Sequence, residues 1–89
     1  MTGPAGFEQY LNGNPHEFFG RAVTCYRAER GWKRKDLCLR ASISYSYLHN
    51  LEEGLKMPSQ QMLGRLAEAL GVAPSELIAR GERIERGDV

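Results

Sequence analysis

Apolar residues recur along the chain at the three- and four-residue spacing of amphipathic helices. This pattern, together with capping residues and Gly or Pro at the expected boundaries, predicts five short helices. The predicted helices span residues 14–30, 34–40, 44–54, 59–71 and 74–81, where Gly81 is expected to end or weaken the last one. The sequence therefore predicts an all-α fold, a compact bundle of five short helices around one small core.

The third predicted helix, residues 44–54, has a polar face that serves no apolar core. Ser44 can accept hydrogen bonds from the backbone N–H groups of its first turn, and Gly54 can adopt the left-handed conformation that closes its last turn. At 100° per residue the outward face collects Tyr45, Ser46, His49, Asn50 and Glu53, and the inward face collects Ile43, Tyr47, Leu48 and Leu51. Hydroxyl, imidazole and carboxamide groups can read base edges in a major groove. Any surface helix of a small domain also has a polar face, so this face alone does not establish a DNA role.

The second predicted helix begins with three consecutive cations, Lys33, Arg34 and Lys35. Cations at a helix N-terminus oppose the helix dipole by roughly 0.3–1 kcal/mol each, so helix stability does not explain them. A phosphate at this helix end would remove the repulsion. Only a tight turn at Ser42 and Ile43 separates this helix from the third, which is the arrangement of a helix-turn-helix. We therefore expect phosphate contacts here, and a plain solvated charge run is the alternative.

From about residue 19 to residue 78 the chain resembles the helix-turn-helix domain of the phage repressor and Cro type, the XRE-like family found in many bacterial regulators. The matching residues are Arg27, Gly31, Leu37-Cys38, Ile43-Ser44, Leu48, Leu51-Glu52-Glu53-Gly54, Pro58 and Leu66-Ala67-Glu68-Ala69-Leu70-Gly71-Val72. The resemblance implies a lambda-repressor-like bundle whose helix 44–53 enters the major groove of DNA. Lys33, Ser42 and Gly64 depart from the family pattern, which bears on local helix stability.

The resemblance also assigns roles to individual residues. It implies that Tyr45, Ser46, His49 and Asn50 contact bases, and that Arg27 and Glu52 form a partly buried ion pair. The predicted phosphate contacts are Lys33, Arg34, Lys35, Tyr47 and Lys56. We expect the ring of Tyr47 to lie against the core as well.

Composition supports a small domain with a localised positive charge. Eighty-nine residues allow one domain with a modest core. The net charge of +1 is weak support for a nucleic-acid binder, but residues 20–56 hold eight Lys or Arg against four acids, a local charge of +4. We expect residues 1–14 to form an arm, residues 15–80 the domain and residues 81–89 a charged tail. No apolar run approaches the ~20 residues that cross a bilayer and no secretory signal is present, so we expect a cytoplasmic protein with no membrane partner.

The sequence lacks the marks of an enzyme or a metalloprotein. No nucleophile–base pair, carboxylate pair or phosphate-binding loop is present, so we expect neither catalysis nor a cofactor. Ser46 and His49 could suggest a hydrolase, but they share an exposed helix face that no pocket encloses. Cys25 and Cys38 have neither zinc-ligand spacing nor the number of a disulfide framework, so we expect reduced thiols.

These patterns predict a transcriptional regulator that binds double-stranded DNA sequence-specifically. A homodimer is expected because one module of this size covers little DNA, with the last helix, Ile84 and the N-terminal arm as candidate contacts. The alternative is a protein-interaction module on the same fold, which docks on a polymerase, a toxin or another regulator. The low net charge and the lack of Lys, Arg or Gln on the polar face of residues 44–53 favour this alternative.

Overall fold

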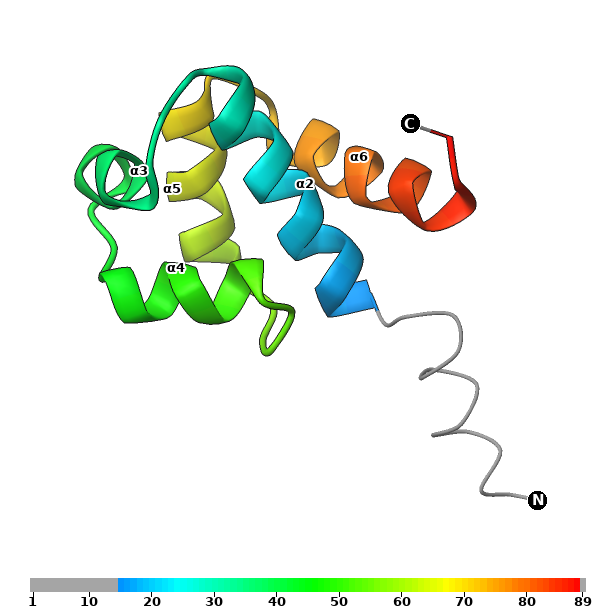
Figure 1. The fold of residues 1–89 in the computed structure, drawn as a ribbon, viewed down its shortest axis with the longest axis horizontal. Coiled ribbons are helices and arrows are strands. Elements are labelled where there is room, and N and C mark those ends of the chain that lie inside the picture. Colours follow the sequence, from blue (N-terminus) through cyan, green and yellow to red (C-terminus); the bar gives the residue numbers. More distant parts are fainter. Residues whose placement is uncertain (1–14, 89) are drawn as a thin grey trace.

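The computed structural model describes residues 15–88, and within that range the chain is helical with no strand (Figure 1). The helices are α2 (Pro15–Glu29), α3 (Arg34–Ala41), α4 (Tyr45–Glu52), α5 (Gln60–Leu70) and α6 (Pro74–Arg86). The predicted all-α class and all five predicted helices are confirmed. The expected arm, residues 1–14, which includes the predicted helix start at Asn14, lies outside the described residues.

Helix α2 is the centre of the packing (Figure 1). It contacts α6 and α4, while α3 contacts α4 and α5, and α5 in turn contacts α6. The core that these helices share consists of Phe19, Ala22, Val23, Leu37, Cys38, Ala41, Leu48, Leu51, Leu66, Leu70 and Leu77. Full burial of a leucine side chain contributes roughly 1.5–3 kcal/mol, so each helix is held mainly by its apolar face.

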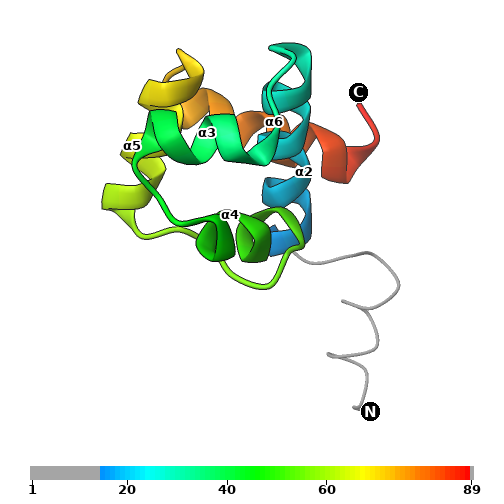
Figure 2. The ribbon, with the colours of Figure 1, turned by 60° about the vertical axis from the view of Figure 1, so that its left-hand side comes forward.

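The axes of α3 and α4 cross steeply. In Figure 1 α3 is seen nearly end-on while α4 lies across the view. In the turned view of Figure 2, α3 lies across the view and α4 is seen nearly end-on. The turn between them passes through Ser42 in the left-handed conformation, with φ 58° and ψ 49°. Its backbone N–H donates to Cys38 O, and Arg65 Nη1 donates to Ser42 O at 3.2 Å. A left-handed conformation is strained for a residue with a side chain, so glycine would fit this turn with less strain than Ser42.

The helix boundaries follow the capping residues that the sequence indicates. The Ser44 hydroxyl accepts from Tyr47 N at 3.0 Å, and the Ser59 hydroxyl accepts from Met62 N at 3.2 Å. Gly54 and Gly71 adopt positive φ values of 78° and 75° after α4 and α5. These caps satisfy backbone groups that the helix ends would otherwise leave unpaired.

The predicted stop at Gly81 is wrong, because α6 continues to Arg86. Gly81 is buried, and a Cβ atom there would lie 3.3 Å from Phe18 O and 3.3 Å from the Cα atom of Phe19. A side chain is thus disfavoured by the close approach of α6 to α2. Residues 81–86, expected as part of a solvated tail, belong to this helix.

Two glycines inside helices differ sharply in their surroundings. Gly64 in α5 allows no close backbone approach, because no atom of residues 15–88 outside its own helix turn lies within 4 Å of a Cβ placed there. At Gly20 in α2 the backbone of another helix does approach closely, and no feature of the sequence indicates this contact. A Cβ atom at Gly20 would lie 2.3 Å from Leu51 O and 2.8 Å from Glu52 O. Glycine at this position lets α2 contact the last turn of α4.

Both cysteines are unpaired, and burial raises the pKa of the Cys38 thiol. Cys38 lies in the core and Cys25 is half-buried on α2. Within residues 15–88 no three His, Cys, Asp or Glu side chains come together as metal ligands could. No helix in that range is long and apolar enough to span a membrane.

Candidate nucleic-acid interface

The polar face of α4 is accessible over most of its length. Tyr45 is 56% exposed, and Ser46 and His49 are exposed as well. Asn50 is half-buried at the edge of this face. On the opposite face Leu48 is fully buried. The structure thus brings all four predicted base-contacting residues together on one short exposed helix.

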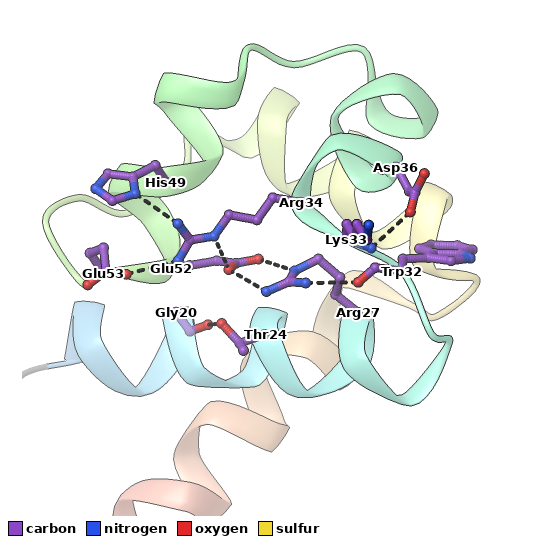
Figure 3. Close-up of polar contacts among 10 residues, drawn as sticks. All are labelled: Gly20, Thr24, Arg27, Trp32, Lys33, Arg34, Asp36, His49, Glu52 and Glu53. Atoms are coloured by element: carbon purple, nitrogen blue, oxygen red, sulfur yellow. Dashed lines mark hydrogen bonds and ion pairs between the residues drawn. The ribbon is translucent and has the colours of Figure 1, made fainter.

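The ion pair expected between Arg27 and Glu52 is present and joins α2 to α4 (Figure 3). Arg27 Nε donates to Glu52 Oε2 at 2.8 Å, and Arg27 Nη2 donates to Glu52 Oε1 at 3.0 Å. Arg27 Nη1 also donates to Trp32 O at 2.8 Å. The Glu52 side chain is 0% exposed, so this two-pronged contact places a carboxylate inside the fold.

Arg34 joins this ion pair from the other side, as Figure 3 shows. Its Nε donates to Glu52 Oε1 at 2.7 Å and its Nη2 donates to Glu53 Oε2 at 2.9 Å. Its Nη1 lies 2.8 Å from His49 Nδ1. The side chain therefore reaches from the first residue of α3 to the last turn of α4, and it couples the two helices of the motif.

The two arginines determine the charge state of Glu52. Burial alone would raise the pKa of the Glu52 carboxyl, but the hydrogen bonds from Arg27 and Arg34 outweigh it and hold that pKa below its ordinary value. The pKa of Arg34 is raised chiefly by its hydrogen bond to Glu52 and then by that to Glu53, with a smaller contribution from the Tyr45 hydroxyl. Two cations and two carboxylates thus balance in this network.

The structure corrects the electrostatic interpretation of the start of α3. Arg34 was expected to be an uncompensated cation there, but Glu52 and Glu53 pair with it. Asp36 also offsets the cations in the first turn, and its Oδ2 accepts from the backbone N–H of Lys33 at 2.9 Å. Lys33 and Lys35 remain exposed with no side-chain partner among residues 15–88. The unfavourable interaction of cations with the helix dipole therefore concerns these two lysines and not Arg34.

The remaining predicted phosphate contacts, Tyr47 in the first turn of α4 and Lys56 in the segment after α4, lie against each other. Lys56 Nζ is 4.8 Å from the centroid of the Tyr47 ring, a cation–π contact. The ring packs against the core, and burial raises the pKa of its hydroxyl group. The predicted phosphate contacts are thus spread over the start of α3, the first turn of α4 and the segment that follows α4.

Sequence reasoning missed two residues that shape this interface. Asp36, at the third position of α3, could have been recognised, because an acid there commonly caps the helix start. Arg65 of α5 holds the carbonyl of Ser42 in the turn. No local pattern marks Arg65, because its partner lies 23 residues away.

Comparison with known protein families agrees with this geometry. Residues 26–77 match the model of a family described as Helix-turn-helix. The chain belongs to this family. The matched segment contains α3, the turn, α4 and α5, so the helix-turn-helix assignment rests on the part of the chain that forms the candidate interface.

Individual relatives of this helix-turn-helix chain carry two kinds of name. The chain is 36% identical over 53 residues to Multiprotein-bridging factor 1 of Eremothecium gossypii, which covers 60% of the chain and 35% of that protein. It is 40% identical over 52 residues to the HTH-type transcriptional regulator DdrOP3 of Deinococcus deserti, which covers 58% of the chain and 40% of that protein. The chain therefore matches only about a third to two fifths of these relatives' length.

A solved structure extends the likeness across nearly all helices. The clp gene regulator ClgR from Corynebacterium glutamicum superposes with a TM-score of 0.78 at 25% identity, over 84% of this chain and 80% of that one. This structure belongs to a protein named as a gene regulator, and the relative from Deinococcus deserti is named as a transcriptional regulator.

Proposed function

We propose that this domain binds double-stranded DNA sequence-specifically as a transcriptional regulator, with α4 lying in the major groove. One observation carries the proposal: a short helix exposes three hydrogen-bonding side chains, with half-buried Asn50 at their edge, while its other face is anchored in the core. The steep crossing of α3 and α4 lets α4 project from the domain. The family model and the relatives named as regulators support this assignment.

The proposed base contacts are Tyr45, Ser46, His49 and Asn50. Asn50 can pair with adenine through the oxygen and the NH2 group of its side-chain amide. The hydroxyls of Tyr45 and Ser46 can donate or accept. Each good two-pronged contact contributes about 1–3 kcal/mol of discrimination against a wrong base. No core packing constrains Ser46 or His49, so base recognition is the simplest role for these exposed side chains.

The proposed phosphate contacts come from three places. Lys33 and Lys35 are exposed at the start of α3, Tyr47 lies in the first turn of α4, and Lys56 follows α4 and contacts the Tyr47 ring. Arg34 donates to Glu52, Glu53 and His49 within the protein, so the phosphate contact that the sequence predicts has to use its remaining N–H groups. Contacts from α3 and from the segment after α4 would fix the register of α4 in the groove.

We further propose that the regulator acts in the cytoplasm as a homodimer. A single module buries little DNA surface, and two-fold pairing doubles both phosphate and base contacts. The exposed C-terminal turns of α6, with half-buried Ile84, are the candidate surface. Residues 1–14, the other candidate, lie outside the described residues.

A protein-interaction role is the second candidate, and two observations favour it. Relatives of the chain are named Multiprotein-bridging factor 1, and several large apolar side chains are exposed. Leu39 on α3 is 74% exposed and Leu55 after α4 is 67% exposed, and neither supports the core. A protein partner that buries these leucines would bind through apolar contacts and not through phosphate neutralisation.

Titration of a fluorescent random-sequence duplex at several salt concentrations separates the two functions. DNA binding predicts salt-sensitive affinity and displacement by heparin, and Lys35→Ala should flatten the log–log slope by about 0.9. Arg80→Ala is the matched control, because Arg80 is a cation that pairs with Glu29 of α2 and lies outside α3, α4 and the C-terminal turns of α6. Salt-insensitive binding, or equal slopes for both variants and the unchanged chain, would contradict the DNA-binding proposal.

A further inference from the structure

The Arg34 guanidinium links the buried ion pair to one residue of the exposed α4 face (Figure 3). Glu52 and Glu53 hold its Nε and Nη2 at 2.7 and 2.9 Å. The third nitrogen, Nη1, lies 2.8 Å from His49 Nδ1. Because charge-assisted bonds to two carboxylates orient the guanidinium plane, the nitrogen that faces His49 has a fixed position.

This contact determines which imidazole nitrogen carries the proton. A guanidinium has five N–H groups and no acceptor, so Arg34 can only donate to His49. His49 Nδ1 is therefore the acceptor, and a neutral imidazole with an accepting Nδ1 carries its proton on Nε2. His49 is exposed, so a ligand that covers α4 meets an N–H donor at Nε2.

An imidazole that presents Nε2–H as a donor suits a base edge that offers only acceptors. In the major groove guanine presents N7 and O6 as acceptors, whereas cytosine presents the N4 amino donor. Adenine places a donor beside its acceptor, and thymine offers the O4 acceptor beside its methyl group, so the contrast is sharpest between guanine and cytosine. The opposite tautomer would present an accepting Nε2, which suits cytosine. The direction of one hydrogen bond therefore distinguishes guanine from cytosine.

We propose that Arg34 is a positioning residue for base recognition: it holds His49 with Nε2–H outward, so that His49 selects guanine over cytosine at one position of the binding site. The inference rests on the proposed DNA-binding function and deepens it. It also gives Arg34 a role other than the phosphate contact predicted from its place at the start of α3.

The Arg34→Lys variant distinguishes the positioning role of Arg34 from a phosphate contact. Arg34→Lys keeps the positive charge, but one ammonium group cannot supply three donors in a fixed plane to Glu52, Glu53 and His49. A positioning role requires Arg34→Lys to lower the guanine preference at one position about two- to tenfold, the size of a single hydrogen bond, with the salt slope retained. A phosphate role alone would leave that preference unchanged.

Arg80→Lys is the matched control for the loss of an arginine ion pair. The Arg80 side chain is 21% exposed, as is that of Arg34, and it pairs with Glu29 and stacks on the Tyr26 ring of α2. Its replacement should lower stability without changing any base preference. Thermal unfolding of both variants establishes that the binding assays report on folded protein.

Binding-site selection from random duplexes measures the preference in the unchanged chain and in Arg34→Lys, His49→Ala and the double variant. The two single variants should relax the same position, and the double variant should lose no more discrimination than His49→Ala alone, because both act through one contact. If His49→Ala relaxes a position that Arg34→Lys leaves intact, the positioning role is refuted.

Nitrogen-15 NMR of the protein without DNA tests the contact independently. His49 should show a protonated Nε2 and an unprotonated Nδ1 when the ring is neutral. A proton on Nδ1 would overturn the inference whatever the DNA result. If selection from the unchanged chain yields no motif, the proposed function fails and the base assignment with it, while a change in the His49 nitrogen shifts between the unchanged chain and Arg34→Lys still establishes whether Arg34 contacts His49.

Discussion

Glu52→Gln should destabilise the fold strongly, because Glu52 neutralises two arginines inside it. The Glu52 side chain is 0% exposed, and Arg27 and Arg34 are 15% and 21% exposed. Removing one partner of a buried ion pair costs about 3–5 kcal/mol. Water reaches both arginines, so we expect the lower end, about 3 kcal/mol. For 89 residues the whole free energy of unfolding is about 4–13 kcal/mol, so this loss is a large fraction of it.

Urea and thermal unfolding, followed by circular dichroism at pH 7, measure this effect. A loss of ~3 kcal/mol in a domain of this size lowers Tm by about 12–24 °C. Glu68→Gln is the control, since Glu68 is an exposed acid on α5, and it should change stability by less than about 0.5 kcal/mol. If Glu52→Gln behaves like Glu68→Gln, the network does not hold α2, α3 and α4 together as described.

The same carboxylate predicts a pH dependence. Its hydrogen bonds to Arg27 and Arg34 lower the pKa of Glu52 in the folded state below the ordinary value of 4.5. The stability that it contributes is therefore complete above that value and is lost as pH falls from there through the folded-state pKa. Glu52→Gln should remove this part of the acid dependence, so the stability gap between the two proteins should narrow below pH 4.5.

Four further variants test other parts of the account. Gly20→Ala should prevent stable folding, because its Cβ would lie 2.3 Å from Leu51 O, and a thermal melt near that of the unchanged chain would contradict the packing of α2 on α4. Gly64→Ala should raise the free energy of unfolding by about 1 kcal/mol in urea, since its Cβ meets nothing within 4 Å, and a lower value would refute this. Lys35→Glu should weaken random-duplex affinity more than Lys35→Ala, and equal affinity would remove its phosphate role. Tyr47→Ala should lower Tm by removing apolar burial, and an unchanged Tm would show that its ring is not part of the packing.

The helix boundaries could be predicted from the sequence because capping is local. Ser44, Ser59, Gly54 and Gly71 act on backbone groups within four residues of themselves. Their chemistry is therefore visible in a short stretch of sequence. The apolar spacing likewise identifies the buried face of each helix without reference to the others.

Glycines that allow close contact could not be predicted in this way. Gly81 has the same local signature as a helix stop, yet it lies inside α6 against the backbone of α2. Gly20 lacks any local mark, and only the position of Leu51 on α4 explains it. The cause in both cases is a second helix that lies far along the chain.

The candidate site likewise combines features that the local sequence predicts with contacts between distant residues that it does not. The exposed residues of α4 follow from helical periodicity, so the sequence could place them on one face. The partners of Arg34 lie 15 to 19 residues away, so its position at the start of α3 suggested a phosphate contact and gave no sign of the link to His49. Arg27 and Glu52 were paired only through the family resemblance, because no local spacing connects residues 25 apart.

Binding-site selection from random duplexes, with the unchanged chain and with Ser46→Ala, His49→Ala and Asn50→Ala, tests most directly whether α4 reads DNA. We expect a defined motif for the unchanged chain and relaxation of a different position for each variant, while affinity for random duplexes stays nearly constant. The same motif from all three variants, or no motif at all, would contradict recognition by α4 and favour the protein-interaction role.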